Sequence, residues 1–179
     1  MHPFIFVNNA INLTPFLAED KHYLVQYLND PVIRRDTLRI PIPYTDEAAA
    51  SWLITVAENR EKLGMEANWV IRHHKNGFLG SIGRALINNG ESHLDEIGYW
   101  LAAPFRGQGI MTAVVQAYST WLFDQHPDLV RIEANVFPHN PASVRVLEKA
   151  GFEREGYSRK LHCKNGVFLD SIRMAKIRE

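Results

Sequence analysis

A strand that passes through a glycine-rich turn into a helix is the most constraining feature of this sequence. Residues 96–101 read as a strand, residues 106–109 form the turn Arg-Gly-Gln-Gly, and a helical pattern starts at Ile110. Glycines let a backbone approach a ligand closely, and the first turn of a helix presents free N–H groups and the positive end of its dipole. The segment predicts a site for a phosphate or pyrophosphate.

Two common phosphate-binding motifs fit this turn poorly. A Walker A loop needs a Lys after its second glycine, and none is present. A dinucleotide-binding fingerprint needs a third glycine where Thr112 stands, and it belongs to a βαβ unit. A turn that merely joins a strand to a helix stays open as an alternative at this point.

The segments before the turn predict antiparallel strands. Apolar runs over residues 68–71, 78–82 and 94–101 are separated by Asn76-Gly77 and by Asn88-Asn89-Gly90. Asn-Gly between apolar runs is the strongest short-range hairpin signal, so these three strands form a meander.

The other elements follow from periodicity and capping signals. Ile11 and Leu13 open a first strand, and a first helix is expected over about 18–28, where Asp30-Pro31 ends it. Further helices are expected from the Thr45 cap to Leu63 and from the Asn140 cap to Gly151. Another is expected over about 110–125, with Ile110, Val114, Ala117 and Trp121 on one stripe. A strand over 130–137 and a last hairpin turned at Asn165-Gly166 complete the chain. The order is β-α-α-β-β-β-α-β-α-β-β, an α/β (α+β) fold.

Composition limits the class of protein. The 179 residues suit one domain over 1–179, and 20 basic residues balance 20 acidic ones, which argues against nucleic acid or an anionic membrane as the main partner. Cys163 is the only cysteine, so a reducing cytoplasm fits. The first residues lack the pattern of a signal peptide, and no apolar run is long enough to span a bilayer.

Two separate segments resemble one enzyme family. The run Arg106-Gly107-Gln108-Gly109-Ile110-Met111 resembles the pyrophosphate loop of GNAT acetyltransferases, with Met111 in place of a small residue. Residues 140–152 resemble the Asn-x-x-Ser…Glu-Lys-x-Gly-Phe signature of the ribosomal-protein N-terminal (RimJ/RimL-type) acetyltransferase branch. The resemblance covers nearly the whole chain and implies a GNAT fold, with a mostly antiparallel sheet splayed between its predicted strands 4 and 5.

The resemblance also implies acetyl-CoA as co-substrate. In the family, the pantetheine arm lies between the splayed strands and the glycine turn holds the pyrophosphate. The residues implied as contacts of the coenzyme are Trp100, Leu101, Arg106, Gly107, Gln108, Gly109, Ile110, Met111, Thr112, Asn135 and Asn140. Asn140 has a second role that coexists with this one, as the cap of its helix.

The resemblance places two catalytic candidates. Glu96 matches a carboxylate base on the fourth strand, which would act directly or through water. The alternative is a Glu without a catalytic role at the end of the strand, either solvated or bound to a nearby Arg. Asp95 points to the opposite face of the strand by alternation. Ser143 matches a serine near the coenzyme sulfur, or it is an ordinary helix-start serine. Leu147 occupies the position at which the family often has a catalytic Tyr, so the general acid is not assigned.

Other chemistries find little support. The eight histidines, His73-His74 among them, show no spacing typical of a metal site, and we expect no metal. The four tryptophans are more typical of a core, although Trp69 and the second helix are candidates for lining an amine pocket.

Three functions remain from the sequence. The first is N-acetylation of a primary amine, either a peptide N-terminus or a small molecule, by direct attack in a ternary complex. The second is a non-catalytic acyl-CoA-binding module, and the third is a nucleotide-dependent oxidoreductase. The sequence identifies neither the acceptor nor whether the protein is a monomer or a homodimer.

Overall fold

The computed structural model of the chain describes residues 3–85 and 92–179. The turn expected at Asn88-Asn89-Gly90 lies outside these residues. Helices, 3-10 turns and strands follow in this order: β1 (Ile5–Asn8), β2 (Ile11–Thr14), η1 (Ala18–Asp20), α1 (Lys21–Leu28), α2 (Pro31–Asp36), α3 (Asp46–Leu63), β3 (Asn68–His73), β4 (Gly77–Arg84), β5 (Leu94–Leu101), η2 (Ala103–Phe105), α4 (Ile110–Gln125), β6 (Arg131–Val136), α5 (Pro141–Lys149), β7 (Glu153–Lys164) and β8 (Val167–Ile177).

The strands form one mostly antiparallel sheet with the hydrogen-bonding order β1-β2-β3-β4-β5-β6-β8-β7. The exception is β5 with β6, which run parallel. Their ladder covers three residue pairs, from Leu94↔Arg131 to Glu96↔Glu133, and stops before Ile97. The mixed sheet and the short pairing of these two strands confirm the predicted fold class.

The chain divides into two compact, interleaved units. One unit contains Met1–Gly83 and Tyr99–Ile110, and the other contains Arg84–Gly98 and Met111–Glu179. Neither unit is a continuous stretch of sequence, because β4, β5 and α4 each pass from one unit to the other. We therefore propose that residues 1–179 form one domain.

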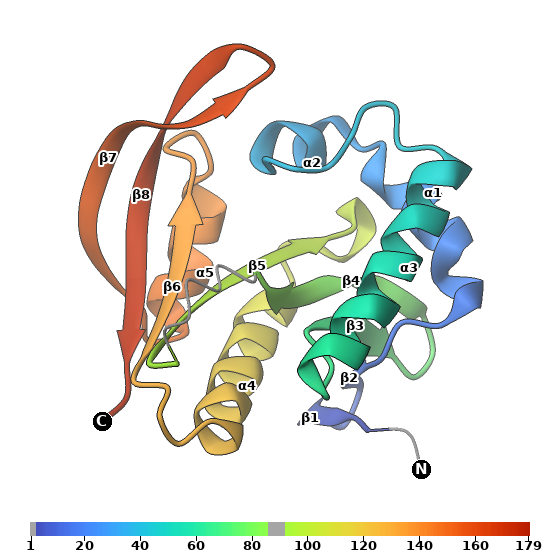
Figure 1. Ribbon diagram of the computed structural model, residues 1–179, viewed down its shortest axis with the longest axis horizontal. Helices are drawn as coiled ribbons and strands as arrows, with labels where there is room; N and C mark the ends of the chain where they lie inside the picture. Colours follow the sequence, from blue (N-terminus) through green and yellow to red (C-terminus); the bar gives the residue numbers. More distant parts are fainter. Residues whose placement is uncertain (1–2, 86–91) are drawn as a thin grey trace. The chain divides into compact units, whose positions relative to one another are not determined.

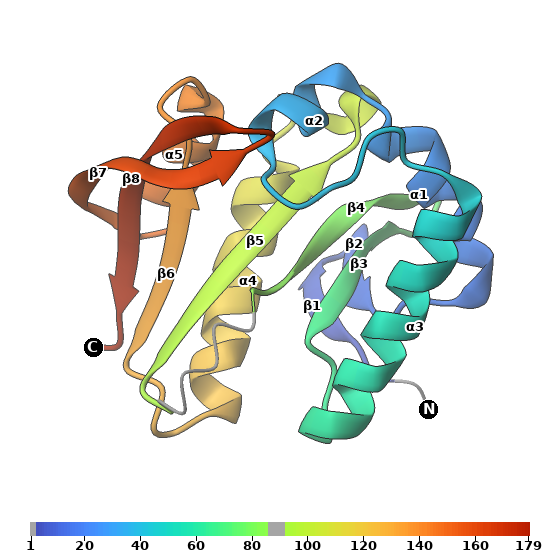
Figure 2. The ribbon, with the colours of Figure 1, turned by 45° about the horizontal axis from the view of Figure 1, so that its top comes forward.

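The first unit is built around an aromatic and aliphatic core. In Figures 1 and 2, α1 and α3 lie side by side over this unit's strands. The core cluster contains Leu24, Leu28, Ile33, Tyr44, Ala49, Val70 and Phe78. Trp69 is only 2% exposed and belongs to the buried residues of this unit, so it does not line an open amine pocket as one alternative suggested. Trp52 and Trp100 pack partly buried against the cluster.

Local capping signals explain the bounds of α3. The side chain of Thr45 accepts a hydrogen bond from the backbone N of Ala48, and Asp46 and Glu47 occupy the first turn. At the other end Gly64 has φ 68°, a left-handed conformation that suits glycine. The helix predicted from the Thr45 cap to Leu63 is confirmed.

Two elements near the N-terminus were missed by the sequence-based prediction. The first is β1, which is joined to β2 by a tight turn. The Asn8 side chain stabilises this turn by accepting hydrogen bonds from the backbone N of Ala10 and of Ile11. Asp30-Pro31 ends α1 as expected, but it also begins α2. The Asp30 side chain accepts from the backbone N of Val32, and Pro31 occupies the first turn.

The second unit contains two helices that contact the same strand. Lys176 of β8 donates from Nζ to the Ala150 carbonyl, which follows α5, at 3.0 Å. It also reaches Ser119 Oγ of α4 at 3.4 Å. Gln116 of α4 donates to the Lys149 carbonyl, which joins the two helices directly. The hairpin β7–β8 continues this sheet and turns at Asn165 and Gly166, as predicted.

The buried face of α4 differs from the predicted stripe. Of the predicted residues Ile110, Val114, Ala117 and Trp121, only Val114 is buried. The buried residues of α4 are Met111, Val114, Val115, Tyr118, Ser119 and Leu122. Both sets repeat at helical spacing because the helix is apolar on several sides, so only packing selects the inner one.

No helix within residues 3–85 and 92–179 is both long and apolar enough to cross a membrane.

Candidate active site

Two glycines give the turn before α4 its conformation. Gly107 has φ 74° and Gly109 has φ 76°, values that L side chains rarely adopt. A Cβ atom added at either residue would meet no other atom within 4 Å. The backbone conformation, and not crowding by the chain itself, therefore favours glycine at both positions, and the space beside the turn is open.

The side chains of the turn are tied to its own surroundings. Arg106 donates from Nε to the Leu101 carbonyl at 2.9 Å and from Nη2 to Asp30 Oδ2 at 2.7 Å. Gln108 donates from Nε2 to the Pro104 carbonyl at 3.1 Å. These contacts brace the loop, and binding of the coenzyme by Arg106 and Gln108 stays a prediction. The backbone N–H groups of the turn thus become the main candidates for binding an anion.

The helix that follows the turn supplies a positive dipole end. α4 is 16 residues long and starts at Ile110. Met111, the departure from the family's small residue, is 7% exposed and packs inward with the buried face of α4. Its side chain therefore leaves the backbone of the first turn accessible. Ile110 and Thr112 are half-buried beside it.

The end of β5 is held against β4. Ala102 donates from its backbone N to the Leu79 carbonyl at 2.9 Å. A Cβ at Gly80 would clash with the backbone of Trp100 and Leu101, so this close approach requires glycine. The Trp100 ring lies 5.8 Å from the Phe78 ring. Trp100 and Leu101 thus form a fixed strand end that leads into the turn.

A row of hydrogen bonds connects three polar side chains across β5, β6 and β8. Asn135 Nδ2 donates to Glu96 Oε2 at 3.0 Å. Ser171 Oγ donates to Asn135 Oδ1 at 3.2 Å. Glu96 and Asn135 are half-buried, whereas Ser171 is completely buried. The expected base therefore has an amide partner on the neighbouring strand, and Asn135 faces it.

Asp95 lies in a different environment from its neighbour Glu96. Its side chain is buried and forms an ion pair with Arg84. Burial raises the pKa of Asp95, and the charge of Arg84 opposes that rise. Asp95 is a buried structural partner, which agrees with the expected alternation of the two carboxylates along the strand.

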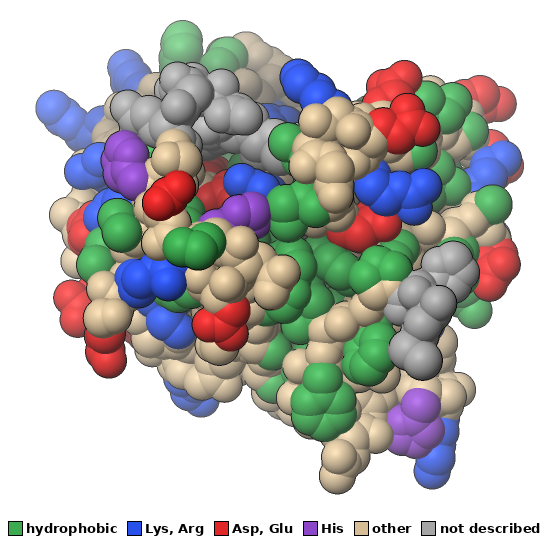
Figure 3. Space-filling model, turned by 60° about the horizontal axis from the view of Figure 1, so that its bottom comes forward, with side chains coloured by type: hydrophobic (Ala, Val, Ile, Leu, Met, Phe, Trp, Pro, Cys, Tyr) green, Lys and Arg blue, Asp and Glu red, His purple; other side chains and the backbone are tan. Residues whose placement is uncertain are grey.

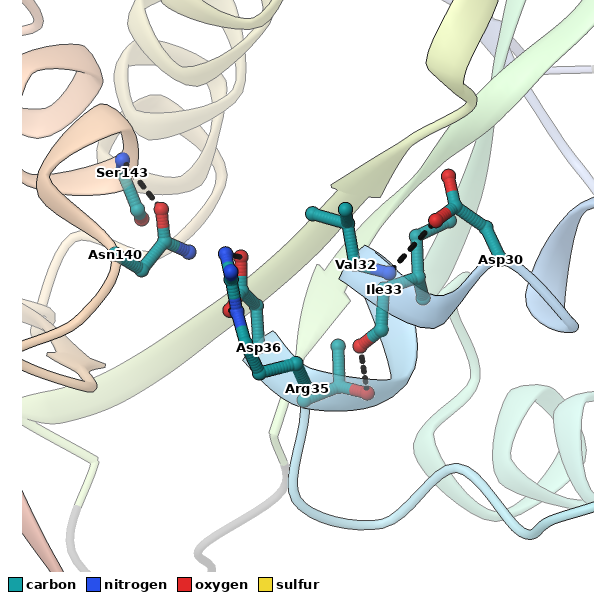
Figure 4. Close-up of polar contacts among 8 residues, drawn as sticks. Asp30, Val32, Ile33, Arg35, Asp36, Asn140 and Ser143 are labelled. Carbon is teal, nitrogen blue, oxygen red and sulfur yellow. Dashed lines mark hydrogen bonds and ion pairs between the residues drawn. The ribbon is translucent and has the colours of Figure 1, made fainter.

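The start of α5 combines a cap with a candidate catalytic serine. Asn140 Oδ1 accepts a hydrogen bond from the backbone N of Ser143 at 3.1 Å, as Figure 4 shows. Pro141 follows the cap, and Gly151 beyond the helix has φ 87°. This capping role of Asn140 was predicted. Leu147, at the family's Tyr position, is completely buried and offers no proton donor.

His73 has a structural role in a turn. His73 Nδ1 accepts from the backbone N of Lys75 and of Asn76, and so supports the turn between β3 and β4. Across residues 3–85 and 92–179, no group of three or more His, Cys, Asp or Glu side chains is arranged to hold a metal ion. Cys163 is exposed on β7.

Residues 10–153 match the family described as the acetyltransferase (GNAT) domain. The chain belongs to the GNAT acetyltransferase family. The match covers the glycine turn, Glu96, Asn135 and the start of α5 in one continuous stretch. It confirms the family that the loop and the residue 140–152 signature indicated.

Relatives and solved structures agree with membership in the GNAT family. The chain is 42% identical over 93 residues to Probable N-acetyltransferase YjcK of Bacillus subtilis, which covers 52% of the chain and 51% of the relative. It is 31% identical over 95 residues to the ribosomal protein uS5-alanine N-acetyltransferase of Escherichia coli, covering 53% and 48%. These alignments span about half the length of each relative.

A solved structure shows the same fold over nearly the full length. The microcin C7 self-immunity acetyltransferase MccE, in complex with acetyl-CoA and AMP, superposes with a TM-score of 0.83 at 20% identity. The match covers 96% of the chain and 94% of that structure. At this identity the likeness supports the GNAT fold.

Sequence reasoning missed two partners of the candidate residues, Asp30 beside Arg106 and Ser171 beside Asn135. Asp30 was interpreted only as a helix end, and Ser171 was not singled out in the last hairpin. No local signal marks either residue, because each contacts a residue far away in the sequence. A strand register for β6 and β8 would have placed Ser171 near Asn135.

Proposed function

We propose that the chain is an acetyl-CoA-dependent N-acetyltransferase that carries an acetyl group to a primary amine by direct attack in a ternary complex. The glycine turn carries this proposal. Gly107 and Gly109 hold positive φ angles beside open space, and the turn leads directly into a 16-residue helix. Such a helix start offers backbone N–H groups and a positive dipole to the pyrophosphate of the coenzyme.

The residues present suit the chemistry of amine acetylation. The neutral amine nitrogen attacks the thioester carbonyl carbon, the C–S bond breaks, and the coenzyme thiolate takes up a proton. Glu96 is the proposed acceptor of the proton released by the ammonium, directly or through water. Ser143 is the proposed hydroxyl near the departing sulfur. Alignment of the two substrates supplies most of the rate, because proximity contributes roughly 7–11 kcal/mol.

The proposed acceptor is the α-amine of a peptide or a small primary amine. On the face shown in Figure 3, side chains of both signs are interspersed, and the whole chain has 20 basic and 20 acidic residues. Such a surface gives little electrostatic steering toward a strongly charged protein. An α-amine has a pKa of about 7.7–8.0, against about 10.4 for lysine. At neutral pH a larger fraction of an α-amine is therefore already neutral, and a single base is enough to deprotonate the rest. The uS5-alanine N-acetyltransferase relative is consistent with this class.

The first experiment separates catalysis from binding. The purified chain is mixed with acetyl-CoA and a panel of amines, and release of free thiol is followed over time. Steady release with an amine and none without it is expected. Tight acetyl-CoA binding without turnover would instead favour a non-catalytic acyl-CoA-binding module. Calorimetric titration with NAD(P) is expected to show no tight binding, which would remove the oxidoreductase alternative.

The second experiment identifies the acceptor. Product masses are mapped after incubation with acetyl-CoA and short peptides, free or blocked at the N-terminus, with and without lysine, alongside polyamines and aminoglycosides. We expect acetylation of free N-termini or small amines. Efficient acetylation of N-blocked lysine peptides, with the other acceptors untouched, would refute the proposed class. A cytoplasmic location and a monomeric or homodimeric state stay predictions.

A further inference from the structure

The register of the sheet brings Glu96, Asn135 and Ser171 to the same face. Glu96 of β5 lies opposite Glu133 of β6, and Asn135 follows Glu133 by two residues. Asn135 lies opposite Arg173 of β8, and Ser171 precedes Arg173 by two residues. Because side chains alternate along a strand, these pairings predict one common face for all three. The two hydrogen bonds that join them confirm it.

The chemistry of the groups sets the direction of the hydrogen bonds. An ionised carboxylate only accepts, so the amide of Asn135 must turn its Nδ2 toward Glu96. Its Oδ1 then faces Ser171, and the serine hydroxyl must donate to it. The Ile172 carbonyl lies farther from Ser171 Oγ, at 3.5 Å, so Asn135 is the better partner. The buried hydroxyl thereby fixes which end of the amide meets the carboxylate.

We propose that Ser171 and Asn135 are positioning residues for Glu96 in acetyl transfer. The inference rests on the proposed function, in which Glu96 accepts the proton of the amine. A carboxylate acting as base must stay within hydrogen-bonding reach of its substrate, and partners that lock its rotamer maintain that geometry. Ser171 acts through Asn135, and it is completely buried, so it orients the base without touching the substrate.

A double-mutant cycle tests the inference on the full chain. Ser171→Ala, Ser171→Thr and Asn135→Leu are made in the wild-type and in the Glu96→Gln background, and kcat and the KM for acetyl-CoA are measured with the best amine of the panel. Ser171→Ala and Asn135→Leu are each expected to lower kcat about 10-fold. Ser171 is buried away from the coenzyme, so Ser171→Ala should change the KM less than about threefold, whereas Asn135→Leu is read on kcat alone because Asn135 is also an expected coenzyme contact. Ser171→Thr keeps the hydroxyl and should recover most of kcat. In the Glu96→Gln background, neither loss should appear.

The matched control is Ser119→Ala. Ser119 is also completely buried in the second unit, but it contacts Gln116 and Lys176 rather than Asn135. It should lower the melting temperature as Ser171→Ala does and leave kcat within about twofold. Asn135→Leu provides an independent reading if Ser171→Ala does not fold.

The outcomes separate the inference from the proposed function. A large loss for Glu96→Gln with no loss for Ser171→Ala or Asn135→Leu would overturn the inference alone. Losses of equal size in both backgrounds would also overturn it, because they would show a role independent of Glu96. Full activity of Glu96→Gln would overturn the role of Glu96 as base, and the inference with it, while acetyl transfer itself would stand. Absence of turnover with every amine would overturn the proposed function.

Discussion

Asp30 and Arg106 are 76 positions apart in the sequence and form an ion pair, in which Arg106 Nη2 lies 2.7 Å from Asp30 Oδ2. Each partner makes a second contact. Asp30 Oδ1 accepts from the backbone N of Val32, and Arg106 Nε donates to the Leu101 carbonyl. One pair of side chains therefore ties the start of α2 to the end of β5 and to the first residue of the glycine turn.

Loss of this ion pair is expected to weaken coenzyme binding. Asp30→Asn keeps an oxygen that accepts from Val32, so the cap of α2 survives while the charge on Arg106's partner is removed. We expect the Kd for acetyl-CoA to rise about 3- to 10-fold by calorimetry, because the turn becomes less ordered. The melting temperature should change little, since this half-buried pair still borders water and should contribute about 1 kcal/mol, near the upper end for surface pairs. Asp36→Asn, which removes the Arg35–Asp36 pair, is the control and should leave the Kd unchanged.

Gly109→Val is expected to abolish acetyl-CoA binding at concentrations that saturate the wild type. A β-branched side chain at φ 76° is strained, and its atoms would occupy the open space beside the turn. Gly166→Val is the matched control. Gly166 has φ 79° and the same open surroundings, but it lies in the turn between β7 and β8. If both variants lose stability equally and only Gly109→Val loses binding, the result supports this turn as the binding site of the coenzyme. Unchanged affinity for acetyl-CoA in a folded Gly109→Val would refute that assignment.

Glu96→Gln is expected to lower kcat by about 100-fold at neutral pH, the usual scale for loss of a general base. Activity should partly recover at alkaline pH, where more of the amine is already neutral. Steady-state rates across a pH series measure both effects. Glu133→Gln is the control on the paired strand, because Arg131 holds its carboxylate. Equal activity of Glu96→Gln and wild type at every pH would make Glu96 a spectator.

Asp95→Asn is expected to reduce the stability of the protein. The substitution removes the buried carboxylate partner of Arg84, which is 20% exposed. We expect a loss of about 1–3 kcal/mol in the free energy of unfolding by urea titration, below the roughly 3–5 kcal/mol for fully buried pairs. Burial raises the pKa of Asp95, so relief of its desolvation limits the loss. The double variant Arg84→Met/Asp95→Leu should regain much of the lost stability. A double variant that is less stable than Asp95→Asn would contradict this account.

His126 is expected to make the protein less stable as the pH falls below neutral. Burial, aided by the charge of Arg84, lowers the pKa of His126 from its ordinary value of about 6.5. The unfolded chain then binds more protons than the native one between the lowered pKa and pH 6.5, so the free energy of unfolding rises with pH through that window. His126→Asn should flatten this slope in urea titrations at pH 5 to 8. An unchanged slope would show that other groups cause it.

Local signals in the sequence were enough to locate most elements. The bounds of α3 depend on Thr45 and Gly64, and those of α5 on Asn140 and Gly151, each within a few residues of the helix end it controls. The glycine turn was equally readable, because its function depends on backbone conformation in one short segment. The same reasoning missed α2, where Asp30 and Pro31 act as a helix start as well as a helix end.

The partners of the site residues were decided only by the tertiary structure. Asn135 lies 39 positions from Glu96 and 36 from Ser171, and the register of β5, β6 and β8 is what brings them together. The partner of Arg106 was likewise decided by folding, which places Asp30 within reach of its guanidinium. The buried face of α4 was also selected by packing, since its sequence is apolar on several sides. Sequence alone determined the turn, the caps and the family, because those depend on neighbours along the chain. Strand register and core packing depend on residues far apart in it, and only the folded chain brings those into contact.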